Sequence, residues 1–332
     1  MQLAPTPGEA AFRTELRAWL AETLPTLPPE PADHDDWTGE EETEAAGAPY
    51  VGCNFVGTLH AGPTIGVEGT PEQRARYLPG ILRGEHIWCQ GFSEPEAGSD
   101  LASLRTTGVR DGDEYVVNGQ KIWTSNAQVA DFCELLVRTD ATAPKHKGIT
   151  WLVMPMDTPG IEVRPMKSLT DKSEFSEMFL TDVRIPVANR VGDENDGWRV
   201  AMVTFGFERG TAFVSELLGS MALVADLVAV AKERGRPDGS TWWDDGETRR
   251  ELARVSAELD AQWAYTKRNV SRAARHGNTG VGGSIFKLAY HETRHRLGDV
   301  AMRVLGRDGL SMGARVGSED HVEERLYALS LS

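Results

Sequence analysis

The feature that most restricts the fold of this chain is a block of short, β-branched segments from Ile87 to about Arg190, set between regions of helical pattern. The segments are separated by Gly, Asp, Asn and Pro, and they include Y-V-V-N-G, D-F-C-E-L-L-V-R, G-I-T-W-L-V-M-P, I-E-V-R-P and E-M-F-L-T-D-V-R-I-P. Such runs are typical of strands joined by turns. Because a run of strands between helical regions indicates a separate domain, we predict a central antiparallel β domain at residues 87–190.

The residues before this block have the pattern of a helical domain, residues 1–86. From Gly8 to Thr23, apolar residues recur at helical spacing with charges between them, which predicts an amphipathic helix. A segment rich in Pro and acidic residues follows and indicates a loop. Further along, Thr70-Pro71-Glu72-Gln73 is typical of a helix start, and Pro79 predicts a kink in that helix.

Residues 191–332 have the pattern of long helices joined by short loops. The helical pattern extends over about residues 198–234, 247–276 and 284–305, and a fourth helix is expected from near Glu319. Long helices with short connections favour an antiparallel four-helix bundle. The predicted fold class is therefore α+β, with an N-terminal helical domain, a central antiparallel β domain and a C-terminal bundle.

Charge and cysteine content narrow the possible partners of the 332-residue chain. Its formal net charge is −15 and no run of Lys or Arg stands out, so nucleic acid and anionic membranes are poor partners. No apolar run is long enough to span a bilayer and no charged-then-apolar leader follows Met1, which predicts a cytoplasmic protein without membrane insertion. Three scattered cysteines, without a C-x-x-C pair, indicate a reducing compartment and no metal site.

The stretch from Trp88 to Asn126 has the residue types of a ligand site. It comprises W-C-Q-G-F-S-E-P-E-A-G-S-D-L, a strand-like piece, and N-G-Q-K-I-W-T-S-N. The hydroxyl residues of its loops are Ser93, Ser99, Thr124 and Ser125. Such loops can present hydroxyls and backbone N–H groups to a flat polar ligand such as a flavin, while the indole of Trp123 covers its face. Taken singly, the first loop is typical of an ordinary turn, and a Trp on a strand is typical of a core residue.

Two long, ungapped motifs in this stretch carry a resemblance to a known family. Q-G-F-S-E-P-E-A-G-S-D at 90–100 and D-E-Y-V-V-N-G-Q-K-I-W-T-S-N at 113–126 resemble the two flavin signatures of the acyl-CoA dehydrogenase family. The resemblance extends over nearly the whole chain and follows its order of helices, strands and helices. It implies an enzyme of lipid metabolism that introduces an α,β double bond into an acyl-CoA, with FAD as hydride acceptor and an external electron-transfer protein.

The resemblance also implies which residues contact the cofactor. The matching positions are Gln90, Phe92, Ser93, Ser99, Trp123 and Ser125. Phe92 and Ser93 match residues that face the flavin ring near its N5 edge, and Ser99 matches a hydroxyl near the diphosphate and the entering thioester. Trp123 matches an indole that packs on the flavin, and Ser125 matches a hydroxyl hydrogen-bonded to it. Donors close to the ring tune a flavin toward accepting hydride, which agrees with these residue types.

The chemistry also requires a carboxylate base close to the acyl chain. In the family this base lies either in a C-terminal Y-E-G-T-like motif or on the first long helix of the C-terminal domain, directly before an Arg. The last helix has no Y-E-G-T-like motif, but F-G-F-E-R-G-T is present, so the resemblance implies Glu208 as base and Arg209 as a substrate-positioning or ion-pairing residue. A solvated surface Glu is the plainer explanation. The flanking Phe205, Phe207 and Phe213 favour a partly apolar setting, where desolvation would raise the carboxyl pKa.

Three departures from the family pattern concern the pocket wall and the subunit contacts. Between Trp37 and Glu42 the family has further helices; its R-x-x-F-G motif is replaced by Gly235-Arg236-Pro237, and its L-G-G-x-G turn by L-G-R-D-G at 305–309. The last two parts normally reach a partner's cofactor. We therefore hypothesise assembly with a non-identical partner, as in actinobacterial relatives acting on bulky, steroid-type CoA thioesters, with a homo-oligomer as the alternative. The rival functions are an oxidase or monooxygenase on the same scaffold and a non-catalytic subunit.

Overall fold

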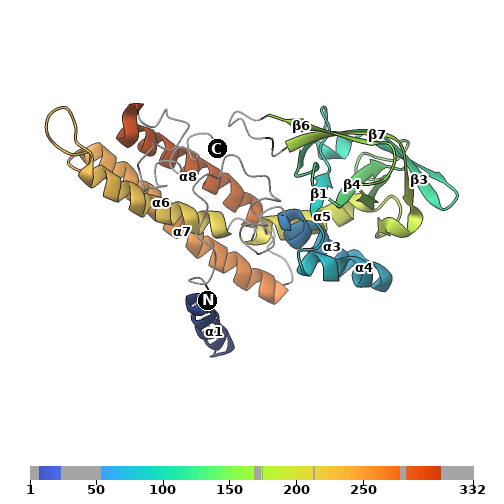
Figure 1. Cartoon of the computed structure of the whole chain (residues 1–332), viewed down its shortest axis with the longest axis horizontal. Helices are drawn as coiled ribbons and strands as arrows, with labels where there is room; N and C mark the ends of the chain where they lie inside the picture. The colour runs from blue at the N-terminus through green and yellow to red at the C-terminus, as the bar shows by residue number, and fades with distance from the viewer. Residues whose placement is uncertain are drawn as a thin grey trace. The chain divides into compact units, whose positions relative to one another are not determined.

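The structure is a computed structural model that describes residues 7–23, 54–167, 173, 175–211, 214–276 and 282–307. The chain divides into two compact units, and their boundary lies between Phe207 and Glu208, within the helix α5 (Gly197–Thr211). Figure 1 shows the helices and strands of both units. No helix within the described ranges is both long and apolar enough to cross a membrane. The division into three domains at residues 86 and 190 stays a prediction.

The helices that precede the sheet include two that the sequence predicts. α1 (Pro7–Thr23) confirms the predicted N-terminal helix, and its Phe12 and Trp19 are 64% and 57% exposed. A π-helical turn, η3 (Gly57–Ala61), leads into α3 (Gly62–Glu68). The segment around Trp37–Glu42, where the family has further helices, lies outside the described residues.

The helix α4 (Pro71–Leu82) begins where its capping residues dictate. Thr70 Oγ1 accepts a hydrogen bond from the Gln73 N–H at 3.2 Å, and Gln73 Oε1 accepts one from the Thr70 N–H at 3.0 Å. This reciprocal pair is a capping box, which satisfies N–H groups that have no partner inside the helix. The predicted start is confirmed, and Pro79 lies inside the helix as expected.

Within the described residues the sheet contains eight strands, seven of which form the order β6-β7-β3-β2-β4-β5-β8, while β1 pairs with β4. They are β1 (Trp88–Gly91), β2 (Thr107–Asp111), β3 (Glu114–Ser125), β4 (Phe132–Arg138), β5 (Ile149–Pro155), β6 (Ile161–Met166), β7 (Phe175–Pro186) and β8 (Arg190–Val191). The predicted strands are confirmed, but the prediction of a purely antiparallel sheet is wrong. β1 pairs with β4 in parallel, and β2 meets β4 in parallel at Thr107 and Arg138. The chain makes the β2–β3 excursion between β1 and β4, and this long connection allows it to enter β4 in the same direction.

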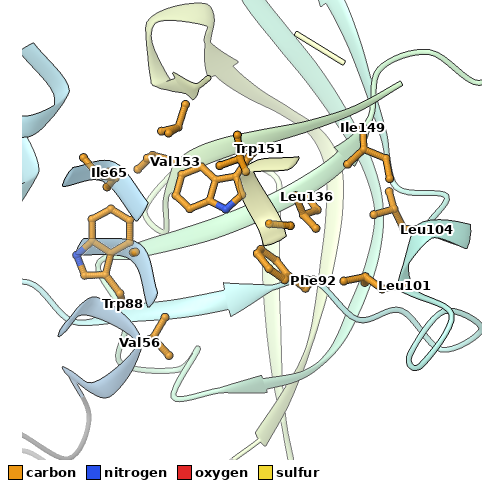
Figure 2. Packing of buried hydrophobic residues seen from close by; sticks show 14 of the residues in the cluster. Val56, Ile65, Trp88, Phe92, Leu101, Leu104, Leu136, Ile149, Trp151 and Val153 are labelled. Carbon is orange, nitrogen blue, oxygen red and sulfur yellow. The ribbon is translucent and has the colours of Figure 1, made fainter. Parts of the chain in front are cut away.

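Strands β1, β4 and β5 are buried on both faces. One face packs against helices α3, α4 and α5 in an apolar cluster that includes Ile65, Trp88 and Trp151 (Figure 2). Neighbouring residues in the same strands, such as Cys89 and Leu152, belong to a second apolar cluster. Successive side chains of a strand point to opposite faces, so double burial explains why these segments do not alternate between apolar and polar residues in the sequence.

The second unit is built on the long helices α6 (Val214–Glu233), α7 (Gly246–His276) and α8 (Gly282–Leu305). α7 and α8 are antiparallel, since Glu247 near the start of α7 pairs with Arg303 near the end of α8, and Gln262 pairs with Thr293 between them. α6 and α5 cover the range predicted as one helix, and residues 212–213 between them lie outside the described residues. The helix expected near Glu319 also lies outside them, so the count of four stays a prediction.

Candidate functional site

The two loop stretches singled out in the sequence are hydrogen-bonded to each other. The N–H of Ile122 in β3 donates to the carbonyl of Ser93 at 3.0 Å. Beside it, Lys121 Nζ donates to the carbonyl of Phe92 at 3.1 Å. The structure therefore brings the loop of Phe92 and Ser93 directly against the strand that carries Trp123.

The loop after β1 offers its backbone, rather than the ring of Phe92, to a ligand. The ring is 2% exposed, lies in the apolar cluster of Figure 2 and makes an edge-to-face contact with Phe205, with the ring centroids 5.9 Å apart. Gly91 lets β1 close onto the sheet, because a Cβ there would lie 2.8 Å from Leu135 Cδ1 and 2.9 Å from Cys133 Sγ. The ring thus anchors the loop in the core.

Trp123 is presented to solvent by a distorted segment of β3. Its φ of 60° lies in the left-handed region, which bulky residues rarely adopt. The distortion coincides with a register shift between Lys121 and Thr124 in the pairing of β3 with β7, and irregularities of this kind re-aim side chains. The indole is 58% exposed and meets Phe175 edge-to-face at a centroid distance of 5.9 Å. Backbone conformations of this kind cluster at ligand-binding sites.

The serine hydroxyls predicted as cofactor donors are accessible. Ser93 and Ser125 are half-buried and Ser99 is exposed, and within the described residues none of these hydroxyls hydrogen-bonds to another group. Gln90 differs, because its Nε2 donates to Glu134 Oε1 at 2.7 Å and lies 3.2 Å from His60 Nδ1. A contact from Gln90 to a ligand is therefore limited to its carbonyl oxygen.

A buried ion pair between Lys121 and Glu94, a residue of the loop after β1, was not predicted from the sequence. Lys121 is fully buried and its Nζ lies 2.9 Å from Oε1 of Glu94. The same carboxylate accepts hydrogen bonds from two N–H groups, from Arg105 at Oε2 (2.6 Å) and from Thr106 at Oε1 (2.9 Å). Burial lowers the pKa of Lys121, and Glu94 offsets part of that effect. For Glu94, burial acts against ionisation, but Lys121 and the N–H donors outweigh it and lower its pKa. The sequence did contain a signal for this burial, because Lys121 lies at an inward-facing position of β3, a strand in which buried and more exposed residues alternate.

The candidate base, Glu208, lies on α5 at the start of the second unit. Its side chain is 15% exposed, and its Oε1 lies 3.6 Å from Nζ of Lys287 on α8. Arg209 follows it on α5, but its side chain lies outside the described residues. The cofactor loops belong to the first unit, which ends at Phe207, and Glu208 belongs to the second.

The phenylalanines that favour a partly apolar setting for Glu208 have different surroundings in the structure. Phe205 turns toward Phe92, and Phe207 is 40% exposed. Phe213 lies outside the described residues. The described charged partner of the Glu208 carboxylate is Lys287. Among all residues that the structure describes, no group of three or more His, Cys, Asp or Glu side chains is placed to hold a metal ion.

Comparison with known proteins assigns both the β domain with its loops and the helices that follow it to one protein family. Residues 89–183 match the acyl-CoA dehydrogenase middle domain, and residues 195–329 match the acyl-CoA dehydrogenase C-terminal domain. The acyl-CoA dehydrogenase IpdE1 of Mycobacterium tuberculosis is 38% identical over 274 residues, which are 82% of this chain and 68% of that protein. The chain belongs to the acyl-CoA dehydrogenase family. The resemblance seen in its two motifs is thereby confirmed.

Solved structures of acyl-CoA dehydrogenases share the fold of this chain. The Tcur3481-Tcur3483 steroid ACAD has a TM-score of 0.77 and 29% identity, over 99% of this chain and 93% of that one. A chain of the ChsE4-ChsE5 complex from Mycobacterium tuberculosis has a TM-score of 0.73 and 30% identity, over 100% of this chain and 93% of that one. As an acyl-CoA dehydrogenase, the protein is an oxidoreductase of a family of flavoproteins that dehydrogenate acyl-CoA.

The loops of this acyl-CoA dehydrogenase fit a flavin in their chemistry. A flavin ring has an extended π face and an edge of nitrogen and oxygen atoms. The exposed indole of Trp123 matches the face, while accessible hydroxyls on both hydrogen-bonded stretches match the edge. The residues present thus include both kinds of contact that the cofactor needs.

Proposed function

We propose that this protein is an FAD-dependent enzyme that introduces an α,β double bond into a CoA thioester. The observation that carries the proposal is the exposed, left-handed Trp123, on a strand hydrogen-bonded to the loop of Phe92 and Ser93. When bound at these loops, FAD supplies the acceptor for the hydride that leaves the β-carbon of the substrate. The other tasks of the reaction fall to side chains of this chain.

The cofactor loops would bind and orient the flavin through one aromatic contact and several polar ones. Trp123 would cover one face of the ring and exclude water from it. The polar contacts would come from Gln90, the backbone of Phe92, and the hydroxyls of Ser93, Ser99 and Ser125, with Ser99 also near the thioester. Pre-positioned donors of this kind act without reorganisation during the reaction.

Glu208 is the proposed base, which removes the proton from the carbon next to the thioester carbonyl. Its carboxylate is largely buried, and the ammonium of Lys287, 3.6 Å from Oε1, favours one orientation of the group. A proton acceptor must be fixed relative to the C–H bond that it attacks, so this restraint suits the role. Arg209, the next residue on α5, would position the substrate.

We further infer a bulky, steroid-type acyl group, because a steroid ACAD is similar to this chain over 99% of its length. Assembly with a non-identical partner is supported by the connection between α6 and α7. There Arg236 N–H donates to the Ser240 carbonyl at 2.7 Å, and Trp242 N–H to the Arg234 carbonyl at 3.1 Å. A segment bonded to itself in this way is not extended toward another subunit's cofactor.

Electron transfer to a separate acceptor protein and a cytoplasmic location complete the proposal. The location follows from the three scattered cysteines of the sequence, which lack a C-x-x-C pair and fit a reducing compartment.

The central test is Glu208→Gln, which keeps the shape of the side chain and removes its basicity. The purified protein is mixed anaerobically with a panel of CoA thioesters while the flavin absorbance is followed. Wild-type flavin should bleach with the correct substrate, and Glu208→Gln should retain its flavin but fail to bleach. Glu216→Gln is the control, because Glu216 is a Glu of the same unit that is 47% exposed and 3.9 Å from its Arg294 partner. Bleaching of Glu208→Gln at the wild-type rate would show that Glu208 is not the base.

Subunit composition is tested by size-exclusion chromatography with flavin quantification. The chain alone should fail to form a stable oligomer with one flavin per subunit, and it should gain flavin when a family member with intact subunit-contact motifs is co-expressed. A stable homotetramer with one flavin per chain would refute assembly with a non-identical partner.

A further inference from the structure

We propose that Lys121 is a positioning residue that fixes and polarises the peptide between Phe92 and Ser93, and so makes the flavin a better hydride acceptor. The inference rests on the proposed FAD site. It concerns a residue that contacts no ligand itself and acts through the backbone of the loop.

The contacts of Lys121 are those of a residue built into the loop. The side chain is fully buried, and Nζ donates to the Phe92 carbonyl at 3.1 Å and to Glu94 Oε1 at 2.9 Å. Removing an ammonium group from water is costly even when it is paired, and apolar residues of similar volume usually fill such a space at lower cost. A lysine here therefore requires an explanation beyond packing, and its bond to a main-chain carbonyl supplies one.

The geometry of the peptide between Phe92 and Ser93 links the bond from Lys121 to the orientation of the Ser93 N–H. A trans peptide is planar, and its C=O and N–H groups point in opposite directions. The structure has no cis peptide within the described residues, so drawing the Phe92 carbonyl toward Lys121 turns the Ser93 N–H away from it. A charge-assisted hydrogen bond to the carbonyl also polarises the peptide and strengthens the N–H as a donor.

The Ser93 N–H belongs to the loop that the family motif places near the flavin N5 edge. Ser93 is held on its other side as well, because its carbonyl accepts from the Ile122 N–H at 3.0 Å. A stronger and fixed donor at this edge stabilises the negative charge that the ring gains on reduction. Loss of Lys121 should therefore make the flavin harder to reduce.

The competing explanation is that Lys121 only neutralises Glu94. That carboxylate orders the start of β2 by accepting from the N–H groups of Arg105 and Thr106, and it would be buried without a cation if Lys121 were absent. Neutralising Glu94 and binding the Phe92 carbonyl can be tested separately. The double variant Lys121→Met/Glu94→Gln removes the unpaired buried carboxylate but does not restore the bond to the Phe92 carbonyl.

The experiment compares Lys121→Met, the double variant Lys121→Met/Glu94→Gln, and Lys145→Met as a control that removes an exposed lysine paired with Asp100. Each protein is purified and supplied with FAD, and the three readouts are thermal stability, the visible spectrum of the bound flavin, and its reduction, measured both as a potential and as a rate. Lys121→Met should be less stable, and the double variant should recover stability. Both should show a more negative potential, a shifted flavin band and flavin reduction slowed by about tenfold, the size expected for losing one strong donor.

The control should match the wild type in all three readouts. A double variant with wild-type potential and spectrum would overturn the inference and leave Lys121 as the counter-ion of Glu94. A wild-type protein that retains no FAD even when it is co-expressed with a family member that has intact subunit-contact motifs would instead refute the proposed function, so the two failures are distinguishable.

Discussion

The left-handed backbone of Trp123 gives a prediction about stability that is independent of any ligand. At an ordinary strand position, Ala is more stable than Gly by about 0.5–1 kcal/mol, because Gly loses more backbone freedom on folding. At Trp123, with φ of 60°, we predict the opposite order: Trp123→Gly should be more stable than Trp123→Ala. Both variants lose the same indole, so its contact with Phe175 cancels from the comparison.

The size of the reversal follows from two opposing terms. A residue with a Cβ in the left-handed region costs about 1–2 kcal/mol, which Gly does not incur. From this cost we subtract the entropic penalty of Gly, about 0.5–1 kcal/mol. The free energy of unfolding of Trp123→Gly should then exceed that of Trp123→Ala by roughly 0.5–1 kcal/mol. For the ligand, loss of an aromatic stacking partner worth about 0.5–1.5 kcal/mol should weaken FAD binding roughly two- to tenfold in both variants.

Urea denaturation followed by circular dichroism measures the stability difference, and titration of flavin fluorescence measures the affinity. Val109 in β2 provides the control site, because its side chain is 62% exposed and it lies opposite Val116 in a regular ladder. Val109→Ala should be more stable than Val109→Gly. If Trp123→Ala equals or exceeds Trp123→Gly, the backbone at 123 is not held in the left-handed region and the argument from strain is wrong.

Two further predictions concern the first unit. Thr70→Ala should lower the free energy of unfolding by about 1 kcal/mol, because the Gln73 N–H loses its acceptor, while Thr70→Ser should stay near wild type in the same urea titration. Acidification should destabilise the protein through Glu94, whose folded-state pKa lies below its ordinary value of 4.5. Its contribution is complete above that value and is lost as pH falls through the folded-state pKa. The free energy of unfolding should therefore fall less steeply with acid in Lys121→Met/Glu94→Gln; equal slopes would contradict this assignment.

The elements of the fold were predictable wherever the signal was local. The cap at Thr70 acts on a residue three positions away, and the apolar runs that became β4 and β5 reflect burial of both faces. The parallel pairing of β1 with β4 was not predictable, because Trp88–Gly91 carries no mark of its direction relative to a strand far along the chain. Strand direction is set by the connection and by the packing of Trp88 against helices outside the sheet.

In the candidate site, too, the features set by local sequence were predictable and those set by contacts between distant segments were not. Its hydroxyl and indole residues occur in compact motifs, so their types and spacing could be recognised. The conformation of Trp123 and the burial of Lys121 could not, because each depends on contacts between two stretches of chain. A lysine within a strand is most often exposed, and the folded loop makes its burial possible by supplying the Glu94 carboxylate and the Phe92 carbonyl as partners.

The left-handed backbone of Trp123 and the buried ammonium of Lys121 have a common explanation. A left-handed bulky residue persists only when the surrounding structure fixes it from both sides. Before Trp123, Lys121 and the N–H of Ile122 are bonded to the first loop, and after it Thr124 is paired with β7, so the backbone at 123 must close a gap between fixed points. The same bonds hold the loop of Ser93. In the proposed flavin site, the same bonds would therefore hold both the stacking face and the donor edge, and a flavin that binds there would lose little free energy to ordering the protein.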